Sequence, residues 1–419
     1  MLALLLFAAL AGGAASSPAT SQQPETITDI RVHGNIVTTD EEITRLAGIE
    51  IGTAITPTTV DEVASRLRAA HRFQHVEVLK RFASIVDPSQ IVLVIVVDEG
   101  PVQIEQTGDP DAPTRVVKRR GPNLLYFPIL SAEDGYGITY GMRLAIADPI
   151  GHQSRLSFPL SWGGDKQAGA EVDKTLARGP INRLVGGASL SRRTNPFYQE
   201  DADRGRVWVR GERQLAHAVR AGVESSWQHV TFVGSSDRVA QIGGDVVLDT
   251  RVDPVLPRNA VYARAAVAQR RFASVGAITT TQVEARGYIG MFGQTVLALR
   301  AMREAADESL PPYEKLLLGG MENLRGFRTG TAAGDILAAG SAELLVPLTS
   351  PLHVGRIGVS AFMDAGTVYD HRERFADQSL KRGAGGSLWF SAAFLRLSVA
   401  VAHGIGSSTR MHVGGTVLF

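Results

Sequence analysis

Hydrophobic and polar residues follow two different patterns along this chain of 419 residues, and the pattern changes near residue 120. From residue 26 to about 102, short alternating segments flank two segments whose hydrophobic residues have helical spacing. The resulting order of strand, helix, helix, strand, strand predicts a small α+β domain. After residue 120, helical spacing is scarce and alternation is frequent, which predicts antiparallel β structure.

The elements of the first domain have clear boundaries in the sequence. The first strand is expected to end at Gly34-Asn35, two residues that tolerate positive φ. Thr39 or Asp40 is a suitable N-cap for a short helix that Gly48 ends. A second helix is expected from Thr56-Pro57. The apolar run Ile91 to Val97 predicts a central strand.

The second pattern predicts a membrane barrel. In residues 155–162, 395–401 and 413–419, apolar side chains lie on one face and small or polar ones on the other. Barrel strands alternate in this way between lipid and lumen, although a soluble sandwich alternates too. The 299 residues after Arg120 allow about 19 residues for each of sixteen strands with its connection, enough for spanning strands of about 9–11 residues. The even number favours closure, because an open edge has no partner in lipid. The strands are predicted to begin near residues 122, 135, 153, 167, 182, 206, 217, 238, 260, 277, 293, 332, 354, 384, 394 and 411.

Composition narrows the possible functions. Lys and Arg number 43 against 42 Asp and Glu, so the broad basic field of a nucleic-acid-binding protein is absent. The chain has no cysteine, which excludes disulfides and thiolate chemistry. It contains no Gly-x-Ser-x-Gly elbow, His-Glu-x-x-His motif or phosphate-binding loop. Its ten histidines show no metal-ligand spacing. We therefore predict no catalytic residue, metal or cofactor.

Two segments outside the domains are also predicted. Residues 1–15 have the apolar core and small residues of a signal peptide, although no Lys or Arg precedes them; a buried helix is the alternative. Residues 16–25 are expected to form a polar leader. Residues 103–121 show neither helical nor strand periodicity and are predicted to be a linker. The domains are then residues 26–102 and 122–419.

The segment Leu317 to Arg328 carries the most informative motif. It is rich in Gly and charge and contains Leu324-Arg325-Gly326-Phe327. This hydrophobic-Arg-Gly-Phe tetrad resembles the signature of the outer-membrane protein assembly superfamily, which includes BamA and TamA. The resemblance implies a loop that folds into the barrel lumen, with Arg325 meeting acidic residues on two neighbouring strands. The matching strand motifs are 343–348 and 362–366, which supply Glu343 and Asp364.

Alternation supports these partners independently. Ala342, Leu344, Val346 and Leu348 form an apolar face, so Glu343 faces inward. The same parity turns Asp364 inward. An arginine in a partly desolvated lumen needs anionic partners. We therefore predict that Arg325, Gly326 and Phe327 with Glu343 and Asp364 lock the loop, with Gly326 allowing a sharp turn and Phe327 packing on the lumen wall.

Further motifs extend the resemblance over residues 26–419. The first domain, with its Gly-Asn turn and closing Asp98-Glu99-Gly100-Pro101, resembles a polypeptide-transport-associated (POTRA) domain. Asp249, Arg251, Asp253 and Pro257 resemble the mid-barrel turn motif of the family, although Ala260 stands where glycine is usual. An ordinary turn is the alternative there. The chain ends on Phe419, as outer-membrane barrels commonly do.

The resemblance implies an outer-membrane barrel of sixteen strands with one POTRA domain in the periplasm. The expected function is to assist folding, insertion or translocation of proteins, without enzymatic chemistry. Expected partners are unfolded outer-membrane or secreted polypeptides, bound by the POTRA domain, and outer-membrane lipids. Two alternatives stay open: a dedicated polypeptide secretion pore, and a passive porin-like channel or surface antigen.

Overall fold

A computed structural model describes the chain in two compact units, divided between Asp98 and Glu99. The described residues are 24–35, 38–70, 72–73, 75–83, 87–99, 102–105, 115–118, 123–151, 153–176, 178–253, 256–349, 355–392 and 395–417. The predicted signal peptide, most of the leader and the terminal Phe419 lie outside these residues.

The first unit is a three-stranded sheet with two helices. Its strand order is β1-β3-β2, so β3, which contains the predicted central run, lies in the middle; β1 pairs with it in parallel and β2 antiparallel. Among the described residues, no helix is both long and apolar enough to cross a membrane. The elements are β1 (Thr26–His33), α2 (Asp40–Ala47), α3 (Thr59–Ala69), β2 (His75–Phe82) and β3 (Gln90–Asp98).

Local sequence explains the ends of these elements. The Thr39 side chain caps α2 by accepting a hydrogen bond from the Glu42 N–H, and Gly48 closes the helix in the left-handed conformation. The second helix begins later than predicted, at Thr59, because the Thr59 hydroxyl accepts from the Thr56 N–H and holds the preceding residues in a turn. The buried side chains between helices and sheet include Ile27, Ile43, Val63, Leu67, Leu93 and Ile95.

The predicted linker is not free of regular structure. Strands β4 (Val102–Glu105) and β5 (Arg115–Lys118) pair antiparallel within it. Four-residue strands are too short to produce a clear periodicity in the sequence, which is why the prediction of an irregular segment was wrong.

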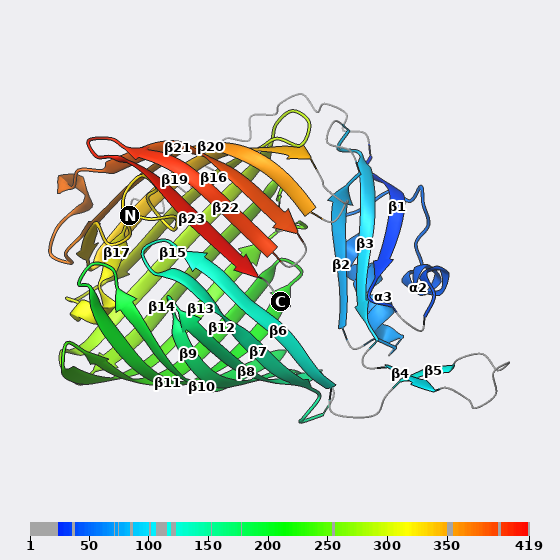
Figure 1. Ribbon diagram of the computed structural model, residues 1–419, viewed down its shortest axis with the longest axis horizontal. Coiled ribbons are helices and arrows are strands. Elements are labelled where there is room, and N and C mark those ends of the chain that lie inside the picture. Colours follow the sequence, from blue (N-terminus) through cyan, green and yellow to red (C-terminus); the bar gives the residue numbers. More distant parts are fainter. Residues whose placement is uncertain are drawn as a thin grey trace. The chain divides into compact units, whose positions relative to one another are not determined.

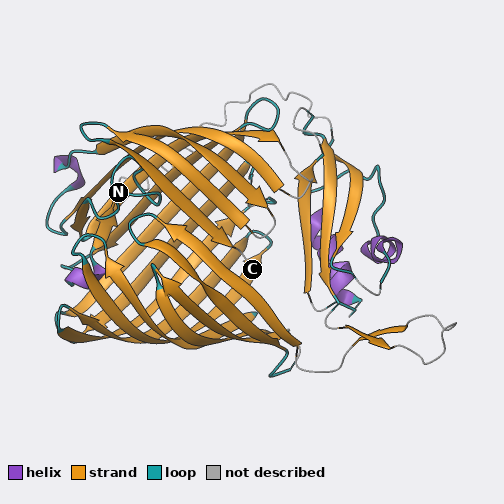
Figure 2. Cartoon of the chain, in the orientation of Figure 1, coloured by secondary structure: helices purple, strands orange, loops and turns teal. Residues whose placement is uncertain are grey.

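The second unit is a closed antiparallel barrel of sixteen strands (Figure 1). Figure 2 shows that strands alone form the wall and that short helical turns occur in its connections. The strands are β6 (Asn123–Glu133), β7 (Gly137–Ala147), β8 (Ser154–Gly163), β9 (Lys166–Thr175), β10 (Arg183–Asn195), β11 (Glu200–Ala216), β12 (Val219–Phe232), β13 (Ser235–Asp249), β14 (Ala260–Phe272), β15 (Gly276–Gly290), β16 (Val296–Ala306), β19 (Ile336–Thr349), β20 (Gly355–Tyr369), β21 (Lys381–Ala392), β22 (Leu395–Gly404) and β23 (Thr409–Val417).

The barrel confirms the predicted number of strands and corrects two of their starts. The strand expected near residue 206 begins at Glu200, because its polar first residues pair with β10 beyond the apolar band. The strand expected near 332 begins at Ile336; residues Ala332–Gly334 instead form a separate short strand, β18.

Alternation divides the wall into an outer and an inner face. Outward-facing Leu190 and Met363 are 70% and 68% exposed, whereas inward-facing Ser157 and Asp364 are 2% and 4% exposed. The outer face is therefore apolar and the lumen polar, as in membrane barrels.

The junction between the last strand and the first, which we call the seam, is the least paired part of the wall. Only Gly415 with Ala132 and Thr416 with Ser131 are strand partners there among the described residues. On either side of the seam, β22 and β23 share nine residue pairs, and β6 and β7 share eleven. Strand pairing therefore contributes less to closure at the seam than elsewhere.

Candidate functional site

The connection between β16 and β19, residues 307–335, is the longest barrel connection within the described part of the chain, and we call it the lumen loop (Figure 1, yellow). It contains a single 3₁₀ turn (Pro312–Glu314). It also contains β17 (Leu316–Leu318), which pairs antiparallel with β18 (Ala332–Gly334). This short ribbon carries the Arg-Gly-Phe motif at its tip.

Arg325 is 8% exposed and pairs with two wall strands. Its Nε and Nη2 donate to Oδ2 and Oδ1 of Asp364, each at 2.8 Å, which is a bidentate guanidinium–carboxylate pair. Its Nη1 donates to Oε2 of Glu343 at 2.9 Å. The guanidinium carbon lies 3.4 Å from the centroid of the Phe362 ring, within the range of a cation–π interaction. The structure therefore brings together the three charged residues that the sequence singled out.

Two serines complete this cluster. Ser341 Oγ accepts from Arg325 Nη2 at 3.0 Å and donates to Asp364 Oδ1 at 2.7 Å. Ser360 Oγ donates to Glu343 Oε1. Every oxygen of both carboxylates thus accepts a hydrogen bond, which offsets the cost of removing them from water. These serines were not among the predicted residues, although their inward parity was a usable signal in the sequence.

The loop tip lies directly on the wall because the wall has glycines there. A Cβ at Gly383 on β21 would lie 2.0 Å from the Arg325 carbonyl oxygen, and one at Gly404 on β22 would lie 2.8 Å from the Phe327 ring. Gly326 has a φ of 92°, which few other residues adopt. Phe327 is buried in a cluster with Leu318, Leu324 and Leu337.

The loop tip also contacts both sides of the seam. The Gly326 N–H donates to Nε2 of His412 on β23 at 2.9 Å. Nδ1 of His412 lies 2.7 Å from Oδ2 of Asp134, in the turn after β6. Because Nε2 accepts, the ring proton is assigned to Nδ1, which donates to Asp134. The Thr329 hydroxyl donates to the Asp134 carbonyl at 2.9 Å. His412, Asp134 and Thr329 were not among the residues predicted from the sequence.

The base of the loop is held by a carboxylate that the sequence did not single out either. Asp335 is fully buried and accepts from Lys315 Nζ at 2.8 Å and from the Leu310 N–H at 2.7 Å. His371, in the connection after β20, contacts its other oxygen at 3.2 Å. Burial opposes ionisation of Asp335, but these hydrogen bonds outweigh it and lower the pKa of the carboxyl group.

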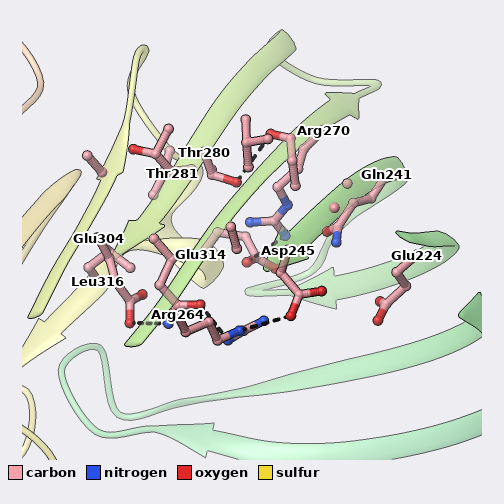
Figure 3. Close-up of a pocket in the computed structure, with 18 of the residues that line it drawn as sticks. Glu224, Gln241, Asp245, Arg264, Arg270, Thr280, Thr281, Glu304, Glu314 and Leu316 are labelled. Carbon is pink, nitrogen blue, oxygen red and sulfur yellow. Dashed lines mark hydrogen bonds and ion pairs between the residues drawn. The ribbon is translucent and has the colours of Figure 1, made fainter. Parts of the chain in front are cut away.

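The 3₁₀ turn of the loop contacts the wall at β11 and β14. Glu314 accepts from Arg204 at 2.6 Å and pairs with Arg270 at 2.8 Å. Burial would raise the pKa of Glu314, but the two guanidinium groups lower it on balance. Glu314, Asp245 and Arg264 line a lumen cavity of about 300 Å³, and Figure 3 shows these side chains. The walls of this cavity hold charges of both signs.

The predicted mid-barrel motif forms the turn between β13 and β14. Asp249 accepts from Nε and Nη2 of Arg251, each at 2.8 Å, and this pairing raises the pKa of the Arg251 guanidinium. Asp253 accepts from Arg356 on β20 at 3.1 Å, and both residues are buried. Pro257 is buried as well. The turn is therefore pinned to a strand more than a hundred residues later in the chain.

The two predicted clusters share one cavity. Arg251 and Pro257 from the turn line a lumen space of about 300 Å³ together with Arg325, Glu343 and Asp364. Nothing in the sequence indicates that these two clusters meet. Within the described residues, no group of three or more His, Asp or Glu side chains could hold a metal ion.

The fold and the loop define the class as outer-membrane β-barrel proteins with an N-terminal POTRA domain. The chain belongs to the Omp85 superfamily: the model of the Omp85 superfamily domain matches residues 132–410. A POTRA model, described as a surface antigen variable number repeat, matches residues 25–100. An Omp85-type barrel places the protein in the outer membrane.

Solved structures show the same fold at low sequence identity. BamA from Haemophilus ducreyi lacking POTRA domains 1–3 is 15% identical, with a TM-score of 0.61 over 94% of this chain and 84% of that one. CdiB from Escherichia coli is 15% identical, with a TM-score of 0.52 over 96% of this chain and 92% of that one. Among curated protein sequences, none matches this chain.

Proposed function

We propose that this protein assists the folding, insertion or translocation of other proteins at the outer membrane, in the manner of BamA and TamA, and does no covalent chemistry. In this proposal the POTRA domain lies in the periplasm, before the strand β6. The lumen loop and the other connections at its end of the barrel then face the outside.

The observation that carries this proposal is the seam. A passive channel gains nothing from a poorly paired junction, whereas a barrel that opens sideways towards the membrane needs one. The seam has two residue pairs, whereas the strand junctions on either side of it have nine and eleven. The wall therefore separates at the lowest cost in free energy at the seam. Gly415, which forms one of the two pairs, adds little packing of its own.

The lumen loop is suited to control the seam. Its tip is fixed to β19 and β20 through Arg325 and touches the seam through His412 and Asp134. We propose that the cluster of Arg325, Glu343 and Asp364 locks this arrangement. Movement of the loop and opening of the seam are then coupled, because the same few residues make both sets of contacts.

The first unit offers an edge for an incoming polypeptide. The outer edge of β1 is partly covered, because Ile27 exchanges backbone hydrogen bonds with Gly52 and Thr53. β2 lies at the other edge of the sheet, and its strand partner among the described strands is β3. An extended substrate segment could pair with β2 by strand addition, using backbone groups and little sequence specificity.

Depletion of the protein in its own host, followed by quantitative proteomics of the outer membrane, tests the function. Broad loss of barrel proteins supports a general insertase. Loss of a single secreted or surface protein identifies a dedicated secretion pore, and no loss at all favours the passive channel.

A disulfide across the seam tests the mechanism. Ala132 and Gly415 are direct strand partners, and such pairs have Cα separations compatible with a disulfide. The chain has no cysteine of its own, so the pair Ala132→Cys and Gly415→Cys forms the engineered bond alone. We expect the oxidised protein to fail to complement depletion and the reduced protein, or either single variant, to succeed. Full function of the oxidised protein would refute opening at the seam.

A further inference from the structure

Several arginines of the lumen pair with acidic side chains. Arg210 pairs with Asp245 at 2.7 Å, and Arg300 pairs with Glu284 at 2.6 Å. Arg270 pairs with Glu314, as described above. These three inward-facing arginines therefore have acidic partners within the protein.

On the outer face, Arg192 pairs with Asp203 at 2.7 Å, but other cations there have no such partner. Lys166, Arg238, Arg271, Arg303 and Arg382 are exposed, and none of these five side chains has an acidic partner within the described residues. We call these five residues the basic belt. Their positions come from strand parity: Arg238 shares the face of outward Ile242, and Arg271 that of outward Val267. Neighbouring residues show the contrast, since Arg270 faces inward and has an acid whereas Arg271 faces outward and has none.

All five residues of the belt lie at the same end of the barrel. Lys166, Arg238 and Arg382 fall within the first four residues of β9, β13 and β21, and Arg271 and Arg303 within the last four of β14 and β16. This is the end that carries the lumen loop. Apolar outward residues continue along the same strands away from this end.

Two tryptophans mark the membrane boundary at this end. Trp162, the penultimate residue of β8, and Trp227 on β12 face outward and are each 49% exposed. Tryptophan is enriched where hydrocarbon meets head groups. The basic belt is thus placed at head-group depth, beside the hydrocarbon boundary.

We propose that the basic belt binds the phosphate groups of anionic lipids in the membrane leaflet at the lumen-loop end. Guanidinium groups recognise phosphate oxygens in a bidentate manner, and phosphate supplies the negative charge that these five side chains lack. A protein partner would also need acidic groups, but it would not require the apolar band directly below the belt. The inference holds whether the barrel inserts, secretes or conducts.

Binding of a fluorescent lipid A with two phosphates to the full chain in nonionic detergent micelles tests the proposal. The belt variant carries Arg238→Gln and Arg271→Gln. The matched control carries Lys174→Gln and Arg213→Gln, two exposed or outward cations at the other end of β9 and β11. Removal of one cation beside anionic lipid should weaken binding about fivefold. We therefore expect the belt variant, which lacks two cations, to bind at least about tenfold more weakly than the unmodified protein. The control should stay within about twofold.

Two further measurements keep this test decisive. The dephosphorylated lipid should bind weakly to every variant, and high salt should weaken binding of the phosphorylated lipid to the unmodified protein. Heat-modifiability on gels must show that all variants are folded barrels. Equal binding by the belt variant, equal binding of the dephosphorylated lipid, or an equal loss in the control would each overturn the proposal, and none of these measurements depends on assembly activity.

Discussion

Replacing Arg325 by alanine removes the cation that holds the lumen loop to two strands. The side chain of Asp364 is 2% exposed, so its carboxylate stays in a site that water scarcely reaches, and that of Glu343 is 22% exposed and therefore partly buried. Arg325→Ala also removes the contact with the Phe362 ring. Breaking a buried pair by deleting one partner costs about 3–5 kcal/mol, because the remaining charge is left without compensation.

Urea unfolding of the barrel in detergent micelles, followed by heat-modifiability on gels, measures this loss. We expect a clearly lower unfolding midpoint for Arg325→Ala and a protease-sensitive lumen loop. Arg328→Ala is the matched control, since Arg328 lies in the same loop but is exposed. Its midpoint should equal that of the unmodified barrel.

A second substitution separates the electrostatic argument from simple loss of packing. If uncompensated charge causes the loss, Arg325→Ala combined with Asp364→Ala should be more stable than Arg325→Ala alone. Additive destabilisation in the double variant, or an unchanged midpoint for Arg325→Ala, would refute this account of the cluster.

Three other predictions follow from the loop contacts. Gly383→Ala should destabilise the barrel by about 1–3 kcal/mol, because its Cβ meets the Arg325 carbonyl oxygen, while Gly386→Ala should cost less; urea midpoints compare them. His412→Ala should loosen the seam, and single-channel recording should detect more frequent opening events; an unchanged record would contradict the contact described for it. The lowered pKa of Asp335 contributes stability that is complete above about pH 4 and is lost as pH falls towards the folded-state value. Asp335→Asn should therefore lower the urea midpoint at neutral pH, and the difference should shrink at acidic pH; a constant difference would argue against the ionised carboxylate.

Local pattern was sufficient for much of this protein. Period-two alternation assigns each side chain to lipid or lumen before any pairing is known. The number of strands could therefore be predicted, and so could the inward position of Glu343 and Asp364. The first helix was equally local, because Thr39 and Gly48 cap it through contacts within a few residues.

Short strands and strand starts were less predictable. β4 and β5 are four residues each, too short for a periodic signal. The start of β11 lies in polar residues whose strand state depends on their partner strand, β10. Such boundaries are set by pairing across the sheet and have no marker in the segment itself.

The sequence by itself determined the order of elements, the two faces of the wall and the charged residues of the lumen loop, since each of these depends on neighbours within one turn or one strand. Only the tertiary structure decided which distant residues meet. His412 lies beside Asp134, 278 residues earlier, and Asp253 beside Arg356. The tertiary structure also decided how few residues pair at the seam. Alternation in the sequence determines which face a side chain lies on, but not the register in which the last strand meets the first.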